Sequence, residues 1–409
     1  MKVIFLSIGG FNSIIEHDQY PDLLRAFQNN GFEVYVVCAN ERKTRRSTEL
    51  VEDHGVKILR VQIGNITQSG IIEKGIATVM VEYQYKFAIK KYFNDIKFDL
   101  VLYTTPPISL ANVVKYLKKQ KQAYAYLILK DIFPQNAVDL GMLQTSGIKG
   151  IIYRYFRNQE KKLYANSDKI GTMSEANRNY ILLHNKEINP KKIEICPNCL
   201  EVQYIKISDN ERIELRKKYN IPTEKIVFVY GGNLGKPQNI SYVIRCIREA
   251  QKLKNIFFWI IGNGTEFSLL KDYIQEEKPI NLKLSERLPK KDYDRLIASC
   301  DVGLIFLDNR FTIPNFPSRM LSYMQAGLPV LACTDKNTDI GSVIVDGQFG
   351  WWLESNNPKE FCNLLRSIKK DELKEKGTMS TLHLQDYDCK KVANNIISHL
   401  KSTKRVKSK

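Results

Sequence analysis

Short apolar runs alternate with longer segments of helical periodicity along most of the chain. Such runs are typical of strands buried on both faces of a sheet. A helix over residues 22–29 and another beginning at Ser109 separate some of these runs. Strands that alternate with helices indicate βαβ units and a doubly wound α/β sheet. In the first half, the expected strands cover residues 3–8, 33–39, 56–62, 98–104, 123–129, 169–172 and 193–196.

A second series of the same kind begins after a short irregular stretch and a helix over residues 211–219. We therefore place a domain boundary near residues 198–210, with one α/β domain on each side. Two such domains imply a cleft, and ligands of these sheets bind at the carboxyl ends of the strands. The expected strands of the second domain cover residues 226–230, 256–261, 282–284, 302–306 and 330–332.

The segment from residue 310 to residue 332 contains the clearest candidate for an anion site. Ser318 is a good N-cap, so a helix is expected to begin there, with Arg319 in its first turn. Gly327 is placed to end that helix. A helix N-terminus with an adjacent Arg suits a diphosphate. The alternative is an ordinary helix–turn–strand unit with a surface Arg.

Three Gly-rich turns follow expected strands, and each exposes backbone N–H groups to a ligand. None matches a dinucleotide-binding fingerprint or a Walker A loop. Lys236 in the second turn and Arg319 can both donate to one diphosphate. The alternative is that these are ordinary βα turns. The glycines and asparagines of interest are Gly9, Gly10, Gly232, Asn233, Gly235, Gly262, Asn263 and Gly264.

In the first domain, Lys130 and Asp131 directly follow an expected strand. A carboxylate at such a position can act as a base or orient a hydroxyl, but it can equally be a turn residue. His17 is the other titratable candidate, and the alternative for it is a solvated loop position.

Composition favours a globular chain with an anionic partner. The 409 residues are 43% hydrophobic and 26% charged, with a net charge of +18. The first residues are expected to form a strand and not a signal peptide, and no apolar run is long enough to span a membrane. Eight scattered cysteines suit a reduced, cytoplasmic protein. The pair Cys196 and Cys199 lacks the second pair that a zinc site needs.

Basic segments gather in the first domain, over residues 115–121 and 148–165. Residues 71–93 are expected to form an amphipathic helix with one broad apolar face. Basic helices with aromatic residues can lie on an anionic membrane; a solvated helix face is the alternative. Nucleic acid is not expected as a partner, because no nucleic-acid-binding signature is present. The final residues 402–409 are expected to be a disordered basic tail.

The ordered set of motifs resembles the bacterial GT-B glycosyltransferases of the family 4 type, in the branch that builds capsules, O-antigens and exopolysaccharides. The resemblance covers nearly the whole chain. It is carried by the early Gly-Gly turn, the block 131–134 followed by 140–143, Pro197-Asn198, the turns 231–235 and 262–264 with Glu266, and Pro317-Ser318-Arg319 followed by 323–330.

The resemblance implies the GT-B fold, with two Rossmann-like domains facing across a cleft. Residues 1–200 would bind the acceptor, and residues 205–384 would bind the nucleotide sugar. A C-terminal helix over residues 385–401 would join the first domain.

The implied activity is retaining transfer of a sugar, with no cofactor and no tightly bound metal. The donor would be a nucleotide-diphosphate sugar, with UDP expected. The acceptor would be a polyprenyl-diphosphate-linked saccharide on the cytoplasmic, inner face of the membrane, where the protein would bind peripherally.

The resemblance also implies the roles of residues. Asp131, Arg319 and Lys236 would be catalytic, and Lys236 and Arg319 would neutralise the leaving diphosphate. Lys130 and His17 are assigned to the acceptor. The residues assigned to the donor are Gly9, Gly10, Gly232, Asn233, Gly235, Gly262, Asn263, Gly264, Arg310, Pro317, Ser318 and Ser322.

Two positions depart from the family pattern. The family's Glu-x7-Glu pair falls on Pro314 and Ser322. A Ser forms fewer hydrogen bonds to a ribose than a Glu, so nucleotide identity and activity both depend on this change. Two alternatives to a transferase therefore stay open: a non-catalytic partner subunit of a glycosyltransferase, and a nucleotide-sugar epimerase of the GT-B fold.

Overall fold

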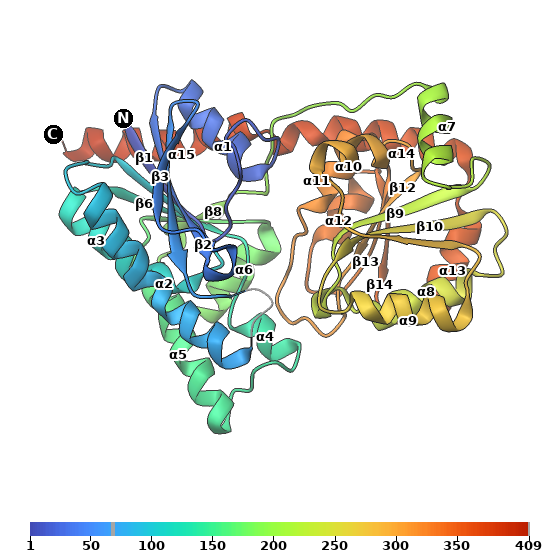
Figure 1. Cartoon of the computed structure of the whole chain (residues 1–409), viewed down its shortest axis with the longest axis horizontal. Helices are drawn as coiled ribbons and strands as arrows, with labels where there is room; N and C mark the ends of the chain where they lie inside the picture. Colours follow the sequence, from blue (N-terminus) through green and yellow to red (C-terminus); the bar gives the residue numbers. More distant parts are fainter. Residues whose placement is uncertain (67–69, 408–409) are drawn as a thin grey trace. The chain divides into compact units, whose positions relative to one another are not determined.

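The computed structural model describes residues 1–66 and 70–407 (Figure 1). The chain divides into two compact units. The first contains Met1–Glu201 together with Cys389–Lys409, and the second contains Val202–Asp388. Each unit is an α/β domain around its own sheet, as the alternating pattern of the sequence predicts.

The first unit is built on an eight-stranded sheet with the order β3-β4-β2-β1-β5-β6-β7-β8. The strands are parallel except for β3, which pairs antiparallel with β4. The sequence pattern missed β3, because its side chains are not buried on both faces. The strands are β1 Lys2–Leu6, β2 Glu33–Glu41, β3 Glu49–Asp53, β4 Val56–Ile63, β5 Leu100–Thr104, β6 Tyr124–Leu129, β7 Lys169–Thr172 and β8 Ile193–Ile195.

Helices cover both faces of this sheet. The β1–α1–β2 connection and the β5–α3–β6 connection step in opposite directions along the sheet, so right-handed crossovers place α1 and α3 on opposite faces. α15 packs against α1, whereas α2 and α5 both pack against α3 (Figure 1). The helices are α1 Gln19–Asn29, α2 Ile71–Tyr92, α3 Ala111–Lys121, α4 Gln135–Asp139, α5 Gly147–Asn166, α6 Glu175–His184 and α15 Cys389–Lys407, with short 3₁₀ turns η1 Arg42–Thr44, η2 Ile108–Leu110 and η3 Pro190–Lys192.

The second unit contains a fully parallel six-stranded sheet with the order β11-β10-β9-β12-β13-β14. Its strands are β9 Ile226–Asn233, β10 Ile256–Asn263, β11 Leu282–Ser285, β12 Val302–Phe306, β13 Val330–Thr334 and β14 Gly350–Glu354. Its helices are α7 Asp209–Lys218, α8 Ile240–Ala250, α9 Phe267–Glu277, α10 Lys290–Ile297, α11 Arg319–Gln325, α12 Ile340–Asp346, α13 Pro358–Ser367 and α14 Lys370–His383, with η4 Lys236–Gln238 and η5 Leu384–Tyr387.

The core of the second unit lies between the sheet and helices α8, α9 and α13. Val302, Leu304 and Phe306 alternate into it from β12, beside apolar side chains of α8 and α13. Strands β12 and β13 are buried along their whole length. A rigid sheet of this kind holds the loops at its carboxyl edge in fixed positions.

The C-terminal segment differs from the expectation in two ways. The long helix begins at Cys389 and not at residue 385, because Leu384–Tyr387 forms a 3₁₀ turn. It then continues to Lys407, so the prediction of a disordered tail from residue 402 is wrong for the described part. No Gly or Pro interrupts this segment, and basic residues are favourable at a helix C-terminus. Residues 408–409 lie outside the described residues.

Helix α2 forms as expected, but it does not have one apolar face. Val81, Tyr85 and Ile89 are buried, whereas Tyr83 and Phe87 on the other side are exposed. The helix is thus apolar on its outward side as well. Ile71 and Ile72, also assigned to the apolar face, lie outside the described side chains. Among the described residues, no helix combines the length and the apolar composition needed to cross a bilayer.

Candidate functional site

Two glycine loops of the second unit pack directly against each other at the carboxyl ends of β9 and β10. Gly232 has φ +129°, which an L side chain rarely adopts. A Cβ on Gly262 would lie 1.9 Å from the carbonyl oxygen of Gly232, and one on Gly264 would lie 2.1 Å from that of Leu234. The packing of the two loops against each other therefore explains both Gly262 and Gly264.

Polar side chains brace the first of these loops. The Asn233 Nδ2 and the Gly235 backbone N–H both donate to Gln238 Oε1, at 3.0 and 3.2 Å. The Asn263 Oδ1 of the second loop accepts from the Arg287 N–H at 3.3 Å. Lys236 begins η4 in the first loop and is exposed. Lys236 is therefore exposed on a loop whose backbone is held by hydrogen bonds.

Arg319 lies beside these loops, at the first position of α11. Its Cζ is 4.3 Å from the centre of the Tyr230 ring, and a Cβ on Gly232 would lie 3.4 Å from it. The Nη1 atom is shielded from solvent and has no hydrogen-bond partner within residues 1–66 and 70–407. A guanidinium is always charged, so an anion at this position would satisfy an otherwise unmet donor.

Two further tyrosines surround Arg319, and the sequence analysis did not find their role. The Tyr323 hydroxyl accepts from the Gly231 N–H at 3.1 Å and donates to the Leu304 carbonyl at 3.0 Å. Burial raises the pKa of Tyr323 to about 12 and holds the pKa of Tyr293 well above its ordinary value. The tyrosines are therefore neutral and leave the charge of Arg319 uncompensated. The sequence could have indicated Tyr323, because its hydroxyl lies on the buried face of the expected helix and a buried hydroxyl needs hydrogen-bond partners.

The start of α11 corrects one prediction. Ser318 has φ −67° and ψ −18°, which is already helical, and its side chain makes no capping hydrogen bond. Its carbonyl instead accepts from the Leu321 N–H at 3.1 Å. The end of the helix is as expected: Gly327 has φ +66°, and the Leu328 N–H donates to the Tyr323 carbonyl at 2.9 Å.

Arg310 is paired within the second unit. Its Nε and Nη2 donate to the two carboxylate oxygens of Asp308, at 3.0 and 2.6 Å, and Asp308 is fully buried. Asp308 lies two residues after the end of β12 and was not singled out from the sequence. Arg310 therefore has a structural role whether or not it binds a donor.

The remaining positions assigned to the donor lie along the same segment. Pro317 and Ser322 are half-buried, and Pro314 is buried. The carbonyl of Pro317 accepts from the Met320 N–H at 3.4 Å. Ser322 lies on α11, one turn after Arg319.

In the first unit, Asp131 follows β6 and is held through its backbone. Its N–H donates to Thr105 Oγ1, whose hydroxyl donates back to the Asp131 carbonyl, both at 3.2 Å. Burial raises the pKa of Asp131 to about 6, against an opposing effect of the Lys130 ammonium. A carboxyl with a pKa in this range suits proton transfer near neutral pH. Thr105 is a positioning residue that the sequence analysis missed.

Lys130 points in another direction from the same strand end. Its Nζ donates to Gln19 Oε1 at 2.5 Å and lies 4.5 Å from the centre of the Tyr20 ring. The ammonium is thus placed beside the start of α1. Both of these contacts are neutral groups, and the ammonium also acts electrostatically on the Asp131 carboxyl, whose pKa it lowers.

Gly9 and Gly10 follow β1 at the same edge of the sheet and are exposed. A Cβ on Gly10 would be 3.5 Å from Cys38 Sγ, an ordinary contact, and one on Gly9 would meet only Ser7 Oγ at 3.8 Å. Packing within the chain therefore does not require glycine at either position. This contrasts with Gly262 and Gly264.

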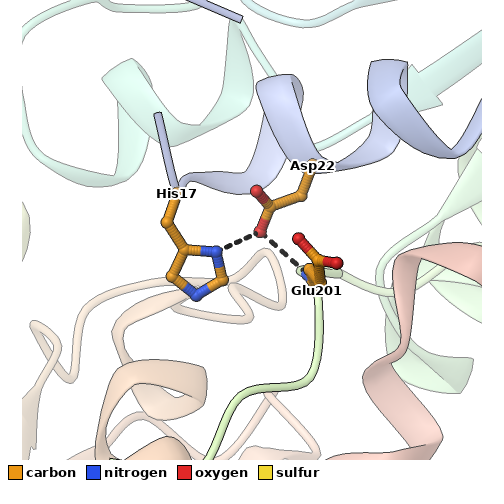
Figure 2. Close-up of side chains that lie close together, drawn as sticks. All are labelled: His17, Asp22 and Glu201. Carbon is orange, nitrogen blue, oxygen red and sulfur yellow. Dashed lines mark hydrogen bonds and ion pairs between the residues drawn. The ribbon is translucent and has the colours of Figure 1, made fainter. Parts of the chain in front are cut away.

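His17 belongs to a cluster with Asp22 and Glu201 (Figure 2). His17 Nδ1 lies 3.0 Å from Asp22 Oδ2, which also accepts from the Glu201 N–H at 2.8 Å. These residue types can bind a metal, but Arg25 Nη2 lies 2.6 Å from Asp22 and 2.9 Å from Glu201. The guanidinium already neutralises the carboxylates and would repel a cation. The cluster instead fixes the end of the first unit at Glu201.

The eight cysteines are all buried as free thiols. Burial raises the pKa of Cys196 to about 12, so this residue is a thiol and not a thiolate at neutral pH.

Comparison with known proteins places the second unit in a family. Residues 211–380 match the family model described as glycosyl transferases group 1. Over 321 residues the chain is 26% identical to the probable glycosyltransferase WbjE of Pseudomonas aeruginosa, covering 77% of this chain and 76% of that one. It is 22% identical over 251 residues to the putative colanic acid biosynthesis glycosyl transferase WcaI of Escherichia coli strain K12, covering 60% of each.

Solved structures agree on the fold. The structure of HepE from Anabaena in complex with UDP matches with a TM-score of 0.70, over 98% of this chain and 100% of HepE, at 14% identity. At this identity the likeness concerns the fold alone. Together, the comparisons show that the chain has the GT-B fold and that its residues 211–380 match the glycosyl transferases group 1 family.

Proposed function

We propose that the protein transfers a sugar from a UDP-linked donor to a lipid-diphosphate-linked saccharide during assembly of a cell-surface polysaccharide. In this proposal the anomeric configuration is retained and no tightly bound metal takes part. The protein works in the cytoplasm, at the inner face of the membrane. The bond between the anomeric carbon and the diphosphate oxygen breaks. A bond to the acceptor oxygen forms, and the acceptor hydroxyl gives up its proton.

The observation that carries the proposal is the unpaired charge of Arg319. Its Nη1 is buried and unpartnered among the described residues, beside the glycine loop that follows β9. A diphosphate is the anion that matches a planar guanidinium, because two of its oxygens can accept parallel hydrogen bonds. The exposed Lys236 of the adjacent loop adds a second cation. In the proposal these two residues stabilise the negative charge that develops on the leaving UDP.

The first unit supplies the acceptor side of the proposal. Asp131 receives a hydrogen bond or the proton from a substrate hydroxyl, for which its raised pKa is suited. Lys130 and His17 bind polar groups of the acceptor, and Gly9 and Gly10 leave room for a substrate over exposed backbone. The names of two relatives support the choice of substrates: WcaI is described as a colanic acid biosynthesis enzyme, and HepE was solved with UDP.

A transfer assay tests the proposal. UDP-glucose, UDP-galactose and UDP-N-acetylglucosamine are each offered with a polyprenyl-diphosphate-linked N-acetylglucosamine, and release of UDP is measured. We expect one donor to release UDP only when the acceptor is present. The Arg319→Gln variant should release far less, whereas Arg366→Gln, an exposed residue near the C-terminal end of α13, should match the wild type.

Two other results would contradict the proposal. Interconversion of the donor sugars without acceptor would indicate the epimerase. Failure to bind any nucleotide would indicate a non-catalytic partner subunit, which the replacement of both family carboxylates by Pro314 and Ser322 would suit.

A further inference from the structure

The outward side of α2 carries a stripe of large apolar side chains. Ile76 is 62% exposed and Phe87 is 71% exposed, and Met80 and Tyr83 lie between them. The spacing of four, three and four residues places all of these on one side of the helix. Because the opposite side of α2 packs on the core, the stripe is not needed to attach the helix to the unit.

Helix α5 carries a second stripe of the same kind. Ile148 is 82% exposed, and Ile151, Ile152 and Tyr155 are exposed on the same side. Both α2 and α5 pack against α3, which lies in the same layer (Figure 1). Eight large apolar side chains therefore reach solvent from one helical layer, which we call the α2–α3–α5 face. Large apolar side chains gathered in this way on the surface of one layer are typical of an interaction site.

The charge of this face has one sign. The three helices contain thirteen Lys and Arg residues and three Glu residues. Glu82 and Glu160 are buried, and Glu73 pairs with Arg42 at 3.2 Å. The exposed surface therefore combines apolar side chains with lysines and Arg154.

We infer that the α2–α3–α5 face docks on an anionic lipid bilayer. Apolar side chains of such a surface enter the boundary between headgroups and acyl chains, and the basic side chains pair with anionic headgroups. A second copy of the chain would bring an equally positive face, which repels. The inference extends the proposed function, because a lipid-linked acceptor would be presented at this surface.

The structure also shows which basic residues are free to contact lipid. Lys118 is tied to Asp168 at 2.7 Å, and Arg157 is tied to Glu160 and to Asn185 at 2.5 and 2.6 Å. These two residues therefore already have partners within the first unit. Lys119 and Arg154, on α3 and α5, are exposed and make no ion pair among the described residues. A test of the charge should therefore use Lys119 and Arg154.

The stripe of α2 leads to the edge of the sheet. Ile76 and Met80 also line a cavity of about 630 Å³, together with Arg42 and Gln62 at the ends of β2 and β4. This is the carboxyl edge of the sheet, where the substrate of an α/β domain binds. A bilayer against the stripe would thus lie beside polar groups suited to an acceptor's head.

Co-sedimentation with vesicles tests the inference, with vesicles of phosphatidylglycerol compared with vesicles of phosphatidylcholine. We expect the wild-type chain to sediment with the former only. The double variant Phe87→Ser, Ile148→Ser should bind about a hundredfold more weakly, which corresponds to about 2.8 kcal/mol. The matched control is Ile280→Ser, Leu382→Ser in the second unit, where the two side chains are 80% and 61% exposed. It should bind like the wild type.

Charge is tested in the same assay. Lys119→Gln, Arg154→Gln should weaken sedimentation, and added salt should do the same, whereas Lys254→Gln, Lys359→Gln in the second unit should not. Absence of vesicle binding, equal binding to both lipids, or an unchanged Phe87→Ser, Ile148→Ser variant would overturn the inference. Light scattering that shows a dimer disrupted by this variant, without vesicle binding, would assign the face to a second copy instead.

The vesicle assay needs neither donor nor turnover. Calorimetric binding of UDP, measured separately, therefore distinguishes failure of the docking face from failure of the proposed function.

Discussion

Arg310 and Arg319 show how two arginines of one segment differ in role. Arg310 is bonded to the buried carboxylate of Asp308, so its charge is met within the chain. Arg319 lies among neutral tyrosines, and its Nη1 has no partner in the described part of the chain. The first arrangement stabilises a loop, and the second is prepared for an anion. Exposure alone would have suggested the reverse, since Arg310 is the more exposed.

The role of Arg310 is tested by Arg310→Ala. Removing its side chain leaves the buried Asp308 carboxylate with fewer donors, which costs about 2 kcal/mol of unfolding free energy. Urea unfolding measures this loss. Arg287→Ala removes an exposed arginine from the same unit and should change stability by less than about 0.5 kcal/mol. Equal losses in the two variants would show that the pair with Asp308 is not structural.

The role proposed for Asp131 predicts that activity depends on pH. Its pKa of about 6 means that the carboxylate becomes protonated below that pH. If the ionised form accepts a substrate proton, kcat/KM of the wild type should fall tenfold for each pH unit below about 6. Asp131→Asn should be much less active and should lack this decline. A wild-type profile that is flat from pH 5 to pH 8 would contradict the assigned role.

The same pKa predicts a change in stability. The folded state raises the pKa above its ordinary value of 3.8, so it favours the neutral carboxyl. This contribution is complete below about pH 3.8 and is lost as the pH rises through 6. Asp131→Asn stays neutral and should be more stable than the wild type above pH 6, by up to about 3 kcal/mol. The difference should vanish near pH 4, as thermal unfolding at the two pH values would show.

At the residue scale, the sequence could predict which positions lie at strand ends but not what they contact. Gly9, Lys236 and Asp131 follow strands as expected. The contact of Arg319 with Tyr230 was not predictable, because the two residues are distant in the chain. The pairing of Arg310 with Asp308 is local, but the sequence does not show that Asp308 is buried. The hydroxyl cap expected of Ser318 fails because the backbone is already helical there.

At the scale of elements, glycine occupies similar turns for different reasons. Gly262 is needed because the loop after β9 lies against it, whereas Gly10 has space for a methyl group. Gly262→Ala should lower the free energy of unfolding by about 3 kcal/mol, since the Gly232 carbonyl blocks the Cβ.

Gly10→Ala is the matched control and should leave stability within about 0.5 kcal/mol. If the donor or acceptor crosses Gly10, this variant should nevertheless lose activity. Chemical unfolding and the transfer assay, run on both variants, separate the two causes. A stable Gly262→Ala would contradict the close packing of the loops.

The predicted boundaries agree best with the structure for strands that are buried on both faces. β12 lies over the residues expected, because its sequence is a continuous apolar run. β7 also lies over the residues expected, although its sequence is only partly apolar. The strand β3 was missed, since an edge strand with exposed acidic residues has no such run. The outward stripe of α2 was also missed, because apolar residues all round a helix do not reveal which side faces the core.

At the scale of the whole molecule, the chain connects the two units twice. Both connections are held by hydrogen bonds where they meet the first unit. Asp22 accepts from the Glu201 N–H at 2.8 Å, and the Cys389 N–H donates to the Leu200 carbonyl at 2.9 Å. On the other side, the Ile205 N–H donates to the Gln325 carbonyl at 2.8 Å. The first connection is thus anchored within a few residues on each side.

Asp22→Ala tests this anchor. The variant removes a buried carboxylate that meets Arg25 and the Glu201 N–H, which should cost the first unit about 3 kcal/mol. In calorimetry we expect two unfolding transitions, one for each unit. The variant should lower one transition, and UDP should raise the other in both proteins. A single transition shifted by both changes would show that the units unfold together.

The central claim is that Arg319 binds the diphosphate of a UDP-linked donor, and isothermal titration calorimetry tests it directly. UDP is titrated into the wild type, Arg319→Lys, Arg319→Gln and Arg366→Gln, with GDP, ADP and dTDP as competing ligands. The account predicts that UDP binds best and that Arg319→Gln loses about tenfold to a hundredfold in affinity. The affinity of Arg319→Lys should lie between those of the wild type and Arg319→Gln, because lysine keeps the charge but not the planar guanidinium. Arg366→Gln, exposed near the C-terminal end of α13, should bind normally. UDP affinity unchanged in Arg319→Gln would contradict the account.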